Sequence, residues 1–229
     1  MARSTKEQAL ATRGRILDAA ELVFQRQGVS QTSLHDIAQG AGVTRGAIYW
    51  HFRDKADVFN AMMQRATLPM EEAAIHTDSP ATDDPIEHLR RSFVDALNKT
   101  VNDPQVRRVF EIATHKVEYV GELQAVRERH LHTRNECLAH VQRGLLLAMR
   151  RGQLSARLPA RAAALGLHAL IDGLIRNWML DPTAFDLVRT GRQVLDAYLA
   201  GLARGEAPRA SAAPRARTPA RATLSRVRT

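Results

Sequence analysis

The sequence contains only one cysteine, Cys137, so no disulfide bond can form within a single chain. A chain without disulfides suits a reducing compartment, and we expect the protein to act in the cytoplasm. No apolar run is long enough to cross a bilayer, and the start of the chain is polar through Thr12. We therefore expect neither a membrane-spanning segment nor a signal peptide.

Aromatic residues and strand-like patterns are also scarce. Only 5% of the residues are aromatic, whereas alanine, leucine, arginine and glutamine are abundant. Few segments alternate between apolar and polar residues in the way a half-buried strand does. These features favour an all-α protein, and 229 residues are enough for one or two domains with a substantial core.

Motifs of catalysis and of cofactor binding are missing as well. The sequence has no nucleophile elbow, phosphate-binding loop or paired catalytic carboxylates, so we predict neither an enzyme nor a cofactor. Five possible metal ligands crowd one segment, namely His130, His132, Glu136, Cys137 and His140. A zinc site needs three or four convergent ligands, but His130 and His132 point to different sides of a helix. We therefore predict no metal site and interpret the segment as a long surface helix.

The net charge of +9 is concentrated at the two ends of the chain. Residues 1–55 carry eight basic and five acidic side chains, and residues 204–229 carry seven arginines and one glutamate. Residues 56–203 are balanced, with eighteen side chains of each sign. This distribution favours a DNA-contacting end over a chain that is coated with positive charge throughout.

The most informative segment is residues 32–55, TSLHDIAQGAGVTRGAIYWHFRDK. It predicts two short helices joined by a tight turn at Gly40 and Gly42, where glycine permits a left-handed backbone. Thr44 is placed to cap the second helix. Helices this short are unstable alone and must be held by their neighbours. The pattern indicates a helix-turn-helix at about residues 33–52, with an ordinary helical hairpin as the alternative.

The second of these helices is suited to a DNA major groove. Arg45 can reach a guanine edge, and Gly46 and Ala47 allow close approach of the backbone. Other side chains of residues 32–55 can bind the phosphates of the DNA backbone or support the contact of this helix with the groove. We predict that the contacts beyond these three residues come from Thr32, Ser33, Thr44, Tyr49, Trp50, His51 and Lys55.

Residues 9–60 resemble the DNA-binding domain of the TetR family of bacterial transcriptional regulators, over TRGRILDAAELVFQRQGVSQTSLHDIAQGAGVTRGAIYWHFRDKADVF. The block VTRGAIYWHF is similar to multidrug-efflux repressors of that family, the AcrR and TtgR types. RRVFEIATHK, RRGQL and residues 170–178 extend the resemblance more loosely. The resemblance implies an all-α fold of about nine helices. It implies a three-helix DNA-binding head at residues 1–55, and an effector-binding and dimerisation body at residues 56–203.

Apolar periodicity predicts where the helices lie. The first helix ends at Gln27, and its stripe of Ile16, Ala20 and Phe24 should close over the helix-turn-helix. Further helices are expected at residues 54–75, 86–101, from 103 onward, and at 122–151, 160–179 and 184–203. The last two helices are apolar on more than one side, which favours a four-helix seam in a homodimer over a larger monomeric core. A helix-turn-helix dimer binds two half-sites of a palindromic operator.

Both ends of the chain leave two interpretations open. Arg3, Lys6 and Arg13 either touch the DNA backbone or form a solvated arm. Residues 204–229 are rich in alanine, proline and arginine without apolar periodicity, so we expect a disordered tail. This tail either adds sequence-independent DNA affinity or is simply solvated.

A single acid, Asp172, stands among residues that should be buried, in LHALIDGLIRNWM. A buried carboxylate needs a partner, which is either Arg176 one turn later or a ligand in an apolar pocket. In TtgR-like proteins such a pocket lies inside the body. The resemblance implies a lining of Phe93, Ala96, Phe110, Thr114, Cys137, Val141, His168, Ile171, Asp172 and Arg176.

The sequence thus predicts a repressor that binds operator DNA and is released by a small hydrophobic effector such as an antimicrobial or aromatic compound. The resemblance alone suggests that it controls a multidrug-efflux operon and thereby antibiotic resistance. Three alternatives are a non-specific DNA-compacting protein, a regulator of a catabolic operon and a ligand-binding enzyme. A footprint on DNA separates the first alternative from a sequence-specific repressor, because compaction would protect DNA diffusely.

Overall fold

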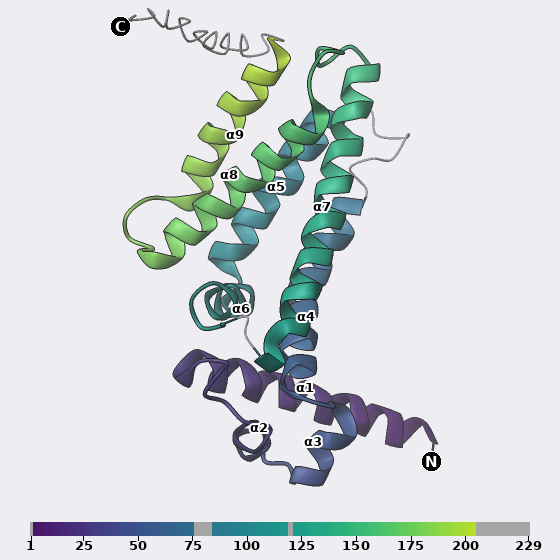
Figure 1. The fold of residues 1–229 in the computed structure, drawn as a ribbon, viewed down its shortest axis with the longest axis vertical. Helices are drawn as coiled ribbons and strands as arrows, with labels where there is room; N and C mark the ends of the chain where they lie inside the picture. The colour runs from purple at the N-terminus through teal and green to yellow at the C-terminus, as the bar shows by residue number, and fades with distance from the viewer. Residues whose placement is uncertain (1, 76–83, 119–120, 205–229) are drawn as a thin grey trace, which may run out of the picture.

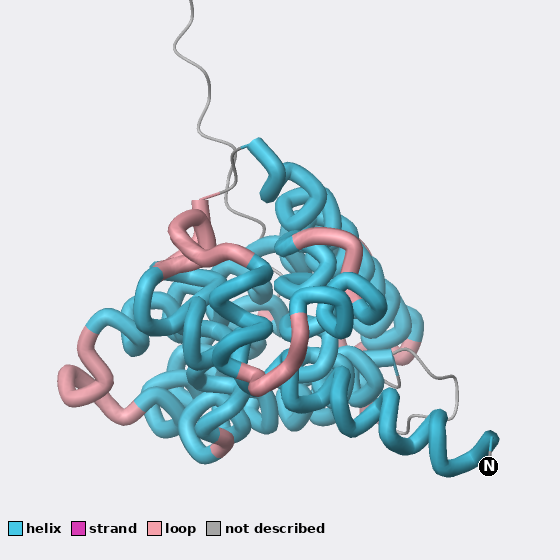
Figure 2. Tube along the Cα trace, turned by 90° about the horizontal axis from the view of Figure 1, so that it is seen from below, coloured by secondary structure: helices cyan, strands magenta, loops and turns pink. Residues whose placement is uncertain are grey.

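The computed structural model describes residues 2–75, 84–118 and 121–204. Nine α-helices and one short 3-10 helix make up this part of the chain, which contains no strand (Figures 1 and 2). The prediction of an all-α fold with about nine helices is confirmed. Except for Arg204, the predicted tail at residues 204–229 lies outside the described residues.

The head consists of α1 (Ala2–Gln27), α2 (Leu34–Gly40) and α3 (Arg45–His51). The predicted stripe on α1 is buried, and Ile16, Ala20 and Phe24 pack with Ile37 and Ile48 in one core. In Figure 1 α1 runs across the bottom of the body, with α2 and α3 beneath it. The first turns of α1 project beyond the rest of the molecule (Figure 2), with Lys6 exposed.

Local capping explains why α2 and α3 begin where they do. Ser33 and Asp36 form a reciprocal capping box at the start of α2, with the Asp36 carboxylate accepting from the Ser33 amide at 2.8 Å. Thr44 caps α3 as predicted, because its hydroxyl accepts from the Ala47 amide at 3.2 Å. Of the two turn glycines only Gly42 adopts a left-handed backbone, with φ +63°. The prediction that Gly40 shares this conformation is wrong, since Gly40 is the last residue of α2.

The body follows as α4 (Lys55–Ile75), α5 (Pro85–Asn102), α6 (Pro104–His115), α7 (Gln124–Arg150), α8 (Ala160–Leu180) and α9 (Leu187–Ala203), with a 3-10 turn at Gly121–Leu123. These bounds agree with the predicted ones to within about three residues. Aspartates cap the N-termini of several of these helices. The Asp103 carboxylate, for example, accepts from the amides of Gln105 and Val106 at 2.9 and 3.2 Å.

The buried apolar side chains of the described residues form three clusters, one lower and two upper. The lower cluster joins the head to α4, α6 and the start of α7, through residues such as Phe59, Ile112 and Val126. The upper clusters join α5, α7, α8 and α9, with Leu145 and Leu195 fully buried. Phe110, which packs against the lower cluster, and Phe93, which packs against both upper clusters, also line a cavity between them.

The outer surface of α8 carries large apolar side chains. Leu165 is 54% exposed and Leu180 is 71% exposed in the single chain. Such exposure is what a dimer seam would need, and the homodimer stays a prediction. Among the described helices, none combines the length and the apolarity that crossing a bilayer requires.

Candidate nucleic-acid interface and ligand cavity

Helix α3 has one buried and one open face. Ile48 is fully buried in the head core, whereas Tyr49 is 50% exposed and Trp50 is 73% exposed. Arg45 is exposed at the first position of the helix, and its guanidinium carbon lies 5.7 Å from the centre of the Tyr49 ring. Gly46 is exposed beside it and Ala47 is partly exposed. The open face therefore offers a cation, a stretch of accessible backbone and two aromatic rings to a groove.

Two residues predicted to touch DNA are turned inward instead. Thr32 is 3% exposed and its hydroxyl donates to the Gly28 carbonyl at 2.7 Å. Lys55 is 6% exposed and its ammonium donates to the Ser30 carbonyl at 3.1 Å. The prediction that Lys55 faces outward is wrong, because the lysine ties the start of α4 to the loop before α2. Thr32 likewise fixes that loop.

Ser33 precedes α2 and His51 ends α3. Ser33 is exposed, but its hydroxyl already takes part in the α2 cap. The His51 ring meets the Trp50 ring edge to face, with 4.6 Å between centres. Burial, helped by the nearby Arg13, holds the pKa of His51 below its usual value. At neutral pH His51 therefore offers a neutral N–H group rather than a positive charge.

A buried carboxylate joins the head to the body. Glu21 of α1 is 2% exposed and forms ion pairs with Arg65 of α4 and with Arg108 of α6, the latter at 3.4 Å. The Gln105 amide of α6 donates to the same carboxylate at 2.8 Å. Arg65 also reaches the exposed Asp18 at 2.8 Å. These four contacts fix α4 and α6 against the same stretch of α1, and we call Glu21, Arg65, Gln105 and Arg108 the Glu21 cluster.

A cavity of about 390 Å³ lies between α4, α5, α6, α7 and α8. Its volume is within the range of about 300–1,000 Å³ that is usual for small-molecule sites, and its surface is predominantly apolar. All ten residues of the predicted effector set line it, which are Phe93, Ala96, Phe110, Thr114, Cys137, Val141, His168, Ile171, Asp172 and Arg176. The structure thus brings together residues from four helices that the sequence separates by up to 83 positions.

Several lining residues were not predicted from the sequence. Met63 and Thr67 come from α4, a helix from which no lining residue was predicted. Lys99 follows Ala96 by three residues on α5, so extending the periodic face of Phe93 and Ala96 would have found it. The remaining missed residues are Leu89, Ser92, Asp95, Ala113, His130, Thr133, Arg134, Glu136, His140 and Ile175.

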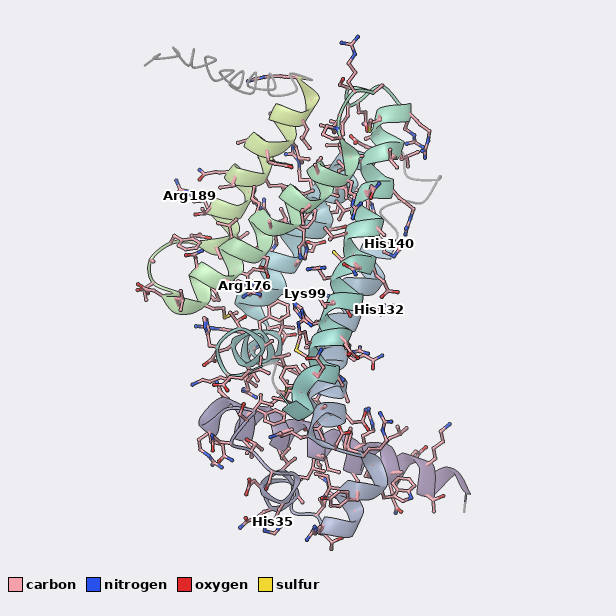
Figure 3. The ribbon with its side chains drawn as sticks, in the orientation of Figure 1. His35, Lys99, His132, His140, Arg176 and Arg189 are labelled. Carbon is pink, nitrogen blue, oxygen red and sulfur yellow. The ribbon has the colours of Figure 1, made fainter. Side chains whose placement is uncertain are left out.

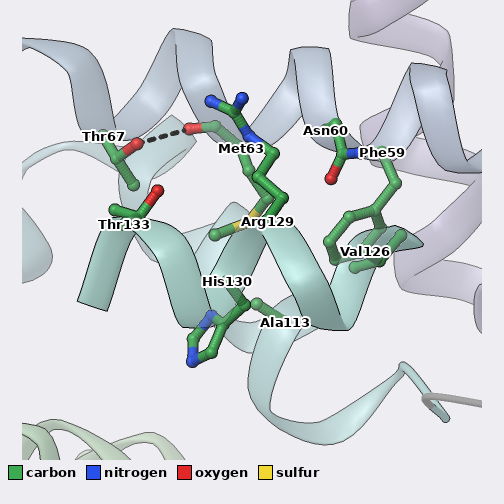
Figure 4. A pocket seen from close by; sticks show the side chains of 9 residues that line it. All are labelled: Phe59, Asn60, Met63, Thr67, Ala113, Val126, Arg129, His130 and Thr133. Atoms are coloured by element: carbon green, nitrogen blue, oxygen red, sulfur yellow. Dashed lines mark hydrogen bonds between the residues drawn. The ribbon is translucent and has the colours of Figure 1, made fainter. Parts of the chain in front are cut away.

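A second cavity of about 40 Å³ adjoins the first between α4, α6 and α7 (Figure 4). Met63, Thr67, Ala113, His130 and Thr133 line both cavities. The Thr67 hydroxyl donates to the Met63 carbonyl at 3.0 Å and thus completes a bond within α4. The smaller cavity is also lined by Phe59, which belongs to the core of the head.

Two histidines of the larger cavity are neutral at physiological pH. Burial is the main cause that lowers the pKa of His168, and the same holds for His130. The cations Arg134 and Arg176 lower both pKa values further, whereas Asp172 opposes the shift. Neutral imidazoles can donate or accept one hydrogen bond each, which suits the orientation of a small polar group.

Asp172 is not buried, contrary to the sequence-based expectation. Its side chain is 48% exposed, and its carboxylate accepts from the Arg176 guanidinium at 2.8 Å. Both residues also line the larger cavity. Of the two partners left open for Asp172, the structure shows Arg176, and the pair forms part of the cavity wall rather than an isolated charge in the core.

We expect Asp172→Asn to change the free energy of unfolding by less than about 1 kcal/mol, because a pair this exposed contributes little. Urea denaturation of both proteins at one protein concentration checks this value. A loss of several kcal/mol would show that Asp172 supports the fold in a way that its exposure does not reveal.

The head has three helices, and its short capped helix α3 exposes an arginine and two aromatic rings. The helical body to which it is tied contains a ligand-sized cavity. Together these features define a helix-turn-helix regulator that responds to a ligand. Residues 16–62 match the profile of bacterial regulatory proteins of the tetR family. Residues 84–203 match the C-terminal region of MAATS-type transcriptional repressors. The chain belongs to the TetR family and is a transcriptional repressor; this family of regulators is not an enzyme family.

Known proteins match the chain over most of its length. It is 39% identical to the regulator TtgR of Pseudomonas putida over 82% of this chain and 90% of that protein. The structure of NalD, the secondary repressor of the MexAB-OprM multidrug efflux pump in Pseudomonas aeruginosa, matches with a TM-score of 0.78 and 34% identity over 86% of this chain and 98% of NalD. SmeT of Stenotrophomonas maltophilia in complex with triclosan matches with a TM-score of 0.78 and 34% identity, over 83% and 91% of the two chains.

Proposed function

We propose that the protein is a homodimer that represses a multidrug-efflux operon and leaves its palindromic operator when a small, mostly apolar effector enters the larger cavity. Two relatives support this proposal, because NalD is a repressor of an efflux pump and SmeT holds triclosan. A bacterial regulator of transcription acts in the cytoplasm, a reducing compartment that suits a chain with a single cysteine. Residues 1–55 form the DNA-binding head and residues 56–203 the regulatory body in this proposal.

The operator contacts come from the open face of α3. Arg45 reads a base edge, Gly46 and Ala47 let the helix lie deep in the groove, and Tyr49 and Trp50 contact the strands beside it. Thr44 and His51 lie at the two ends of α3 and hold the phosphates. Thr32, Ser33 and Lys55 have no direct part, since the head uses their side chains internally.

Arg45→Ala is expected to weaken operator binding by about 1–3 kcal/mol and to relax the preference at one base pair of each half-site. Arg91→Ala, which removes an exposed arginine of α5 far from the head, is the matched control and should bind as the native protein does. Selection of bound duplexes from a random pool, followed by titration, measures both quantities. An unchanged base preference in Arg45→Ala would contradict the proposed docking of α3.

The position of α4 is the observation that carries the proposal. Only three residues separate this helix from α3, and Phe59 and Met62 on one side of it belong to the core of the head. Met63 and Thr67 on another side line the larger cavity. A ligand that moves these two side chains acts on the same rigid helix that positions α3.

Helix α6 provides a second connection. Phe110 and Thr114 line the cavity, whereas Gln105 and Arg108 belong to the Glu21 cluster and bind the Glu21 carboxylate. An effector therefore contacts both helices that hold α1. The effector can release DNA only if it binds the DNA-bound and the DNA-free conformations of the protein with unequal affinity. It must prefer the DNA-free conformation by about a hundredfold to lower the occupancy of the operator substantially.

The dimer is proposed to form through α8 and α9. The exposed Leu165 and Leu180 would be covered by the same surface of a second copy. Replacing Leu165 by glutamate should therefore favour the monomer in sedimentation at micromolar concentration. A native protein that sediments as a monomer bound to a single half-site would contradict this arrangement.

A footprint on DNA upstream of an efflux operon tests the proposed function. A discrete, two-fold symmetric protected site supports a repressor, and diffuse protection supports non-specific compaction. A discrete site upstream of a catabolic operon would still support a repressor, but one that controls a catabolic operon instead of an efflux operon.

A further inference from the structure

Lys99 is the one lysine among the described residues that line the larger cavity. It lies on α5, is partly buried and lines the cavity together with Phe93 and Ala96 on the same helix face. Figure 3 shows Lys99 and Arg176 in the region where α5 and α8 face α7. Lys99 thus presents an ammonium group to a predominantly apolar space.

The other cations of the wall are already occupied. Arg176 binds Asp172 at 2.8 Å, and the Arg134 guanidinium donates to the Asn135 amide oxygen at 2.9 Å. Within residues 2–75, 84–118 and 121–204, the Lys99 ammonium forms no ion pair and no hydrogen bond. Asp95, one turn earlier on α5, is exposed and does not pair with it.

The acids of the wall are poor anchors for a cationic ligand. Asp172 is used by Arg176, Glu136 is 61% exposed with His132 at 3.4 Å, and Asp95 is exposed to water, which screens its charge. An apolar site that holds a cation without a counter-ion favours a ligand that brings the missing negative charge, because a charge-assisted hydrogen bond recovers the cost of removing the ammonium from water.

We propose that the effector is a compact, mostly aromatic or aliphatic weak acid whose carboxylate or phenolate oxygen pairs with Lys99. The apolar part of such a molecule lies against Phe93, Phe110 and Ile171, which line the same cavity. The neutral His168 and Thr114 can bind a second polar group. This inference rests on the proposed function, since it takes the larger cavity to be the effector site.

A matched pair of ligands tests the inference, namely naproxen, which carries a carboxylate, and its primary amide, which has nearly the same shape without the charge. Binding of each to the full-length protein is measured by calorimetry. We expect the acid to bind at least about tenfold more tightly than the amide. In Lys99→Met, which keeps most of the aliphatic stem, the two affinities should come within about threefold of each other while the amide affinity stays unchanged.

Lys116→Met is the control variant, because Lys116 follows α6 outside both cavities. It should keep the native preference for the acid. Equal binding of acid and amide by the native protein, or an acid preference that survives in Lys99→Met, would overturn the role of Lys99 but leave the cavity as an effector site. Failure of both ligands to bind would overturn the acid preference and count against the cavity as the effector site as well.

Discussion

Replacing Glu21 by alanine is expected to lower the free energy of unfolding by about 3 kcal/mol, because it leaves two partly buried arginines without their common anion. Arg65 and Arg108 keep 28% and 30% of their side chains exposed, so the loss should stay near the lower end for a broken buried ion pair. Urea denaturation at a fixed protein concentration measures it, since the stability of a dimer depends on concentration.

Asp18 provides the matched control for Glu21. It pairs with the same arginine, Arg65, at 2.8 Å, but its side chain is 66% exposed. Asp18→Ala should therefore cost less than about 1 kcal/mol. If Glu21→Ala does not fold, Glu21→Gln keeps the shape of the side chain and should show a smaller loss in the same direction. Equal losses in Asp18→Ala and Glu21→Ala would contradict the importance of the buried cluster.

Ile48→Ala and Trp50→Ala should separate the two faces of α3. Ile48 is fully buried, so its truncation should destabilise the protein by about 2–5 kcal/mol and impair DNA binding through loss of the folded head. Trp50 is 73% exposed, so its truncation should change stability by no more than about 0.5 kcal/mol while weakening operator binding. Thermal unfolding and operator titration of both variants provide the comparison.

The same measurements would show if the buried and exposed faces of α3 were assigned the wrong way round. A destabilised Trp50→Ala protein, or an Ile48→Ala protein that retains full stability, would show that α3 is rotated relative to the described orientation. A Trp50→Ala protein with native stability and native operator affinity would remove the ring from the proposed interface but leave the packing of α3 intact.

Local patterns in the sequence were sufficient to predict where the helices lie. Capping residues such as Ser33, Thr44 and Asp103 mark helix starts through contacts with residues two or three positions away. Apolar periodicity likewise identified the buried face of α1, including Ile16 and Phe24. These signals depend on neighbours within one or two turns, and a single sequence contains them fully.

The site depended on contacts between distant segments, and there the residues alone were less informative. Lys55 looked like one more cation after the recognition helix, but its partner is a carbonyl that lies 25 positions earlier. Glu21 was an unremarkable helical acid until α4 and α6 brought Arg65 and Arg108 to it. The cavity residues came from the resemblance to TtgR-like proteins, because no periodic pattern shows which faces of five helices meet.

Coupling between the cavity and α3 is tested most directly by titrating a fluorescent operator duplex with the protein at increasing concentrations of triclosan, the ligand of SmeT. Our account predicts that triclosan weakens operator affinity and that the operator weakens triclosan affinity by the same factor. Ala96→Trp, which fills the larger cavity, should keep operator affinity and lose this response. Triclosan that binds the native protein without changing operator affinity, or release that persists in Ala96→Trp, would contradict the claim that the cavity controls DNA binding.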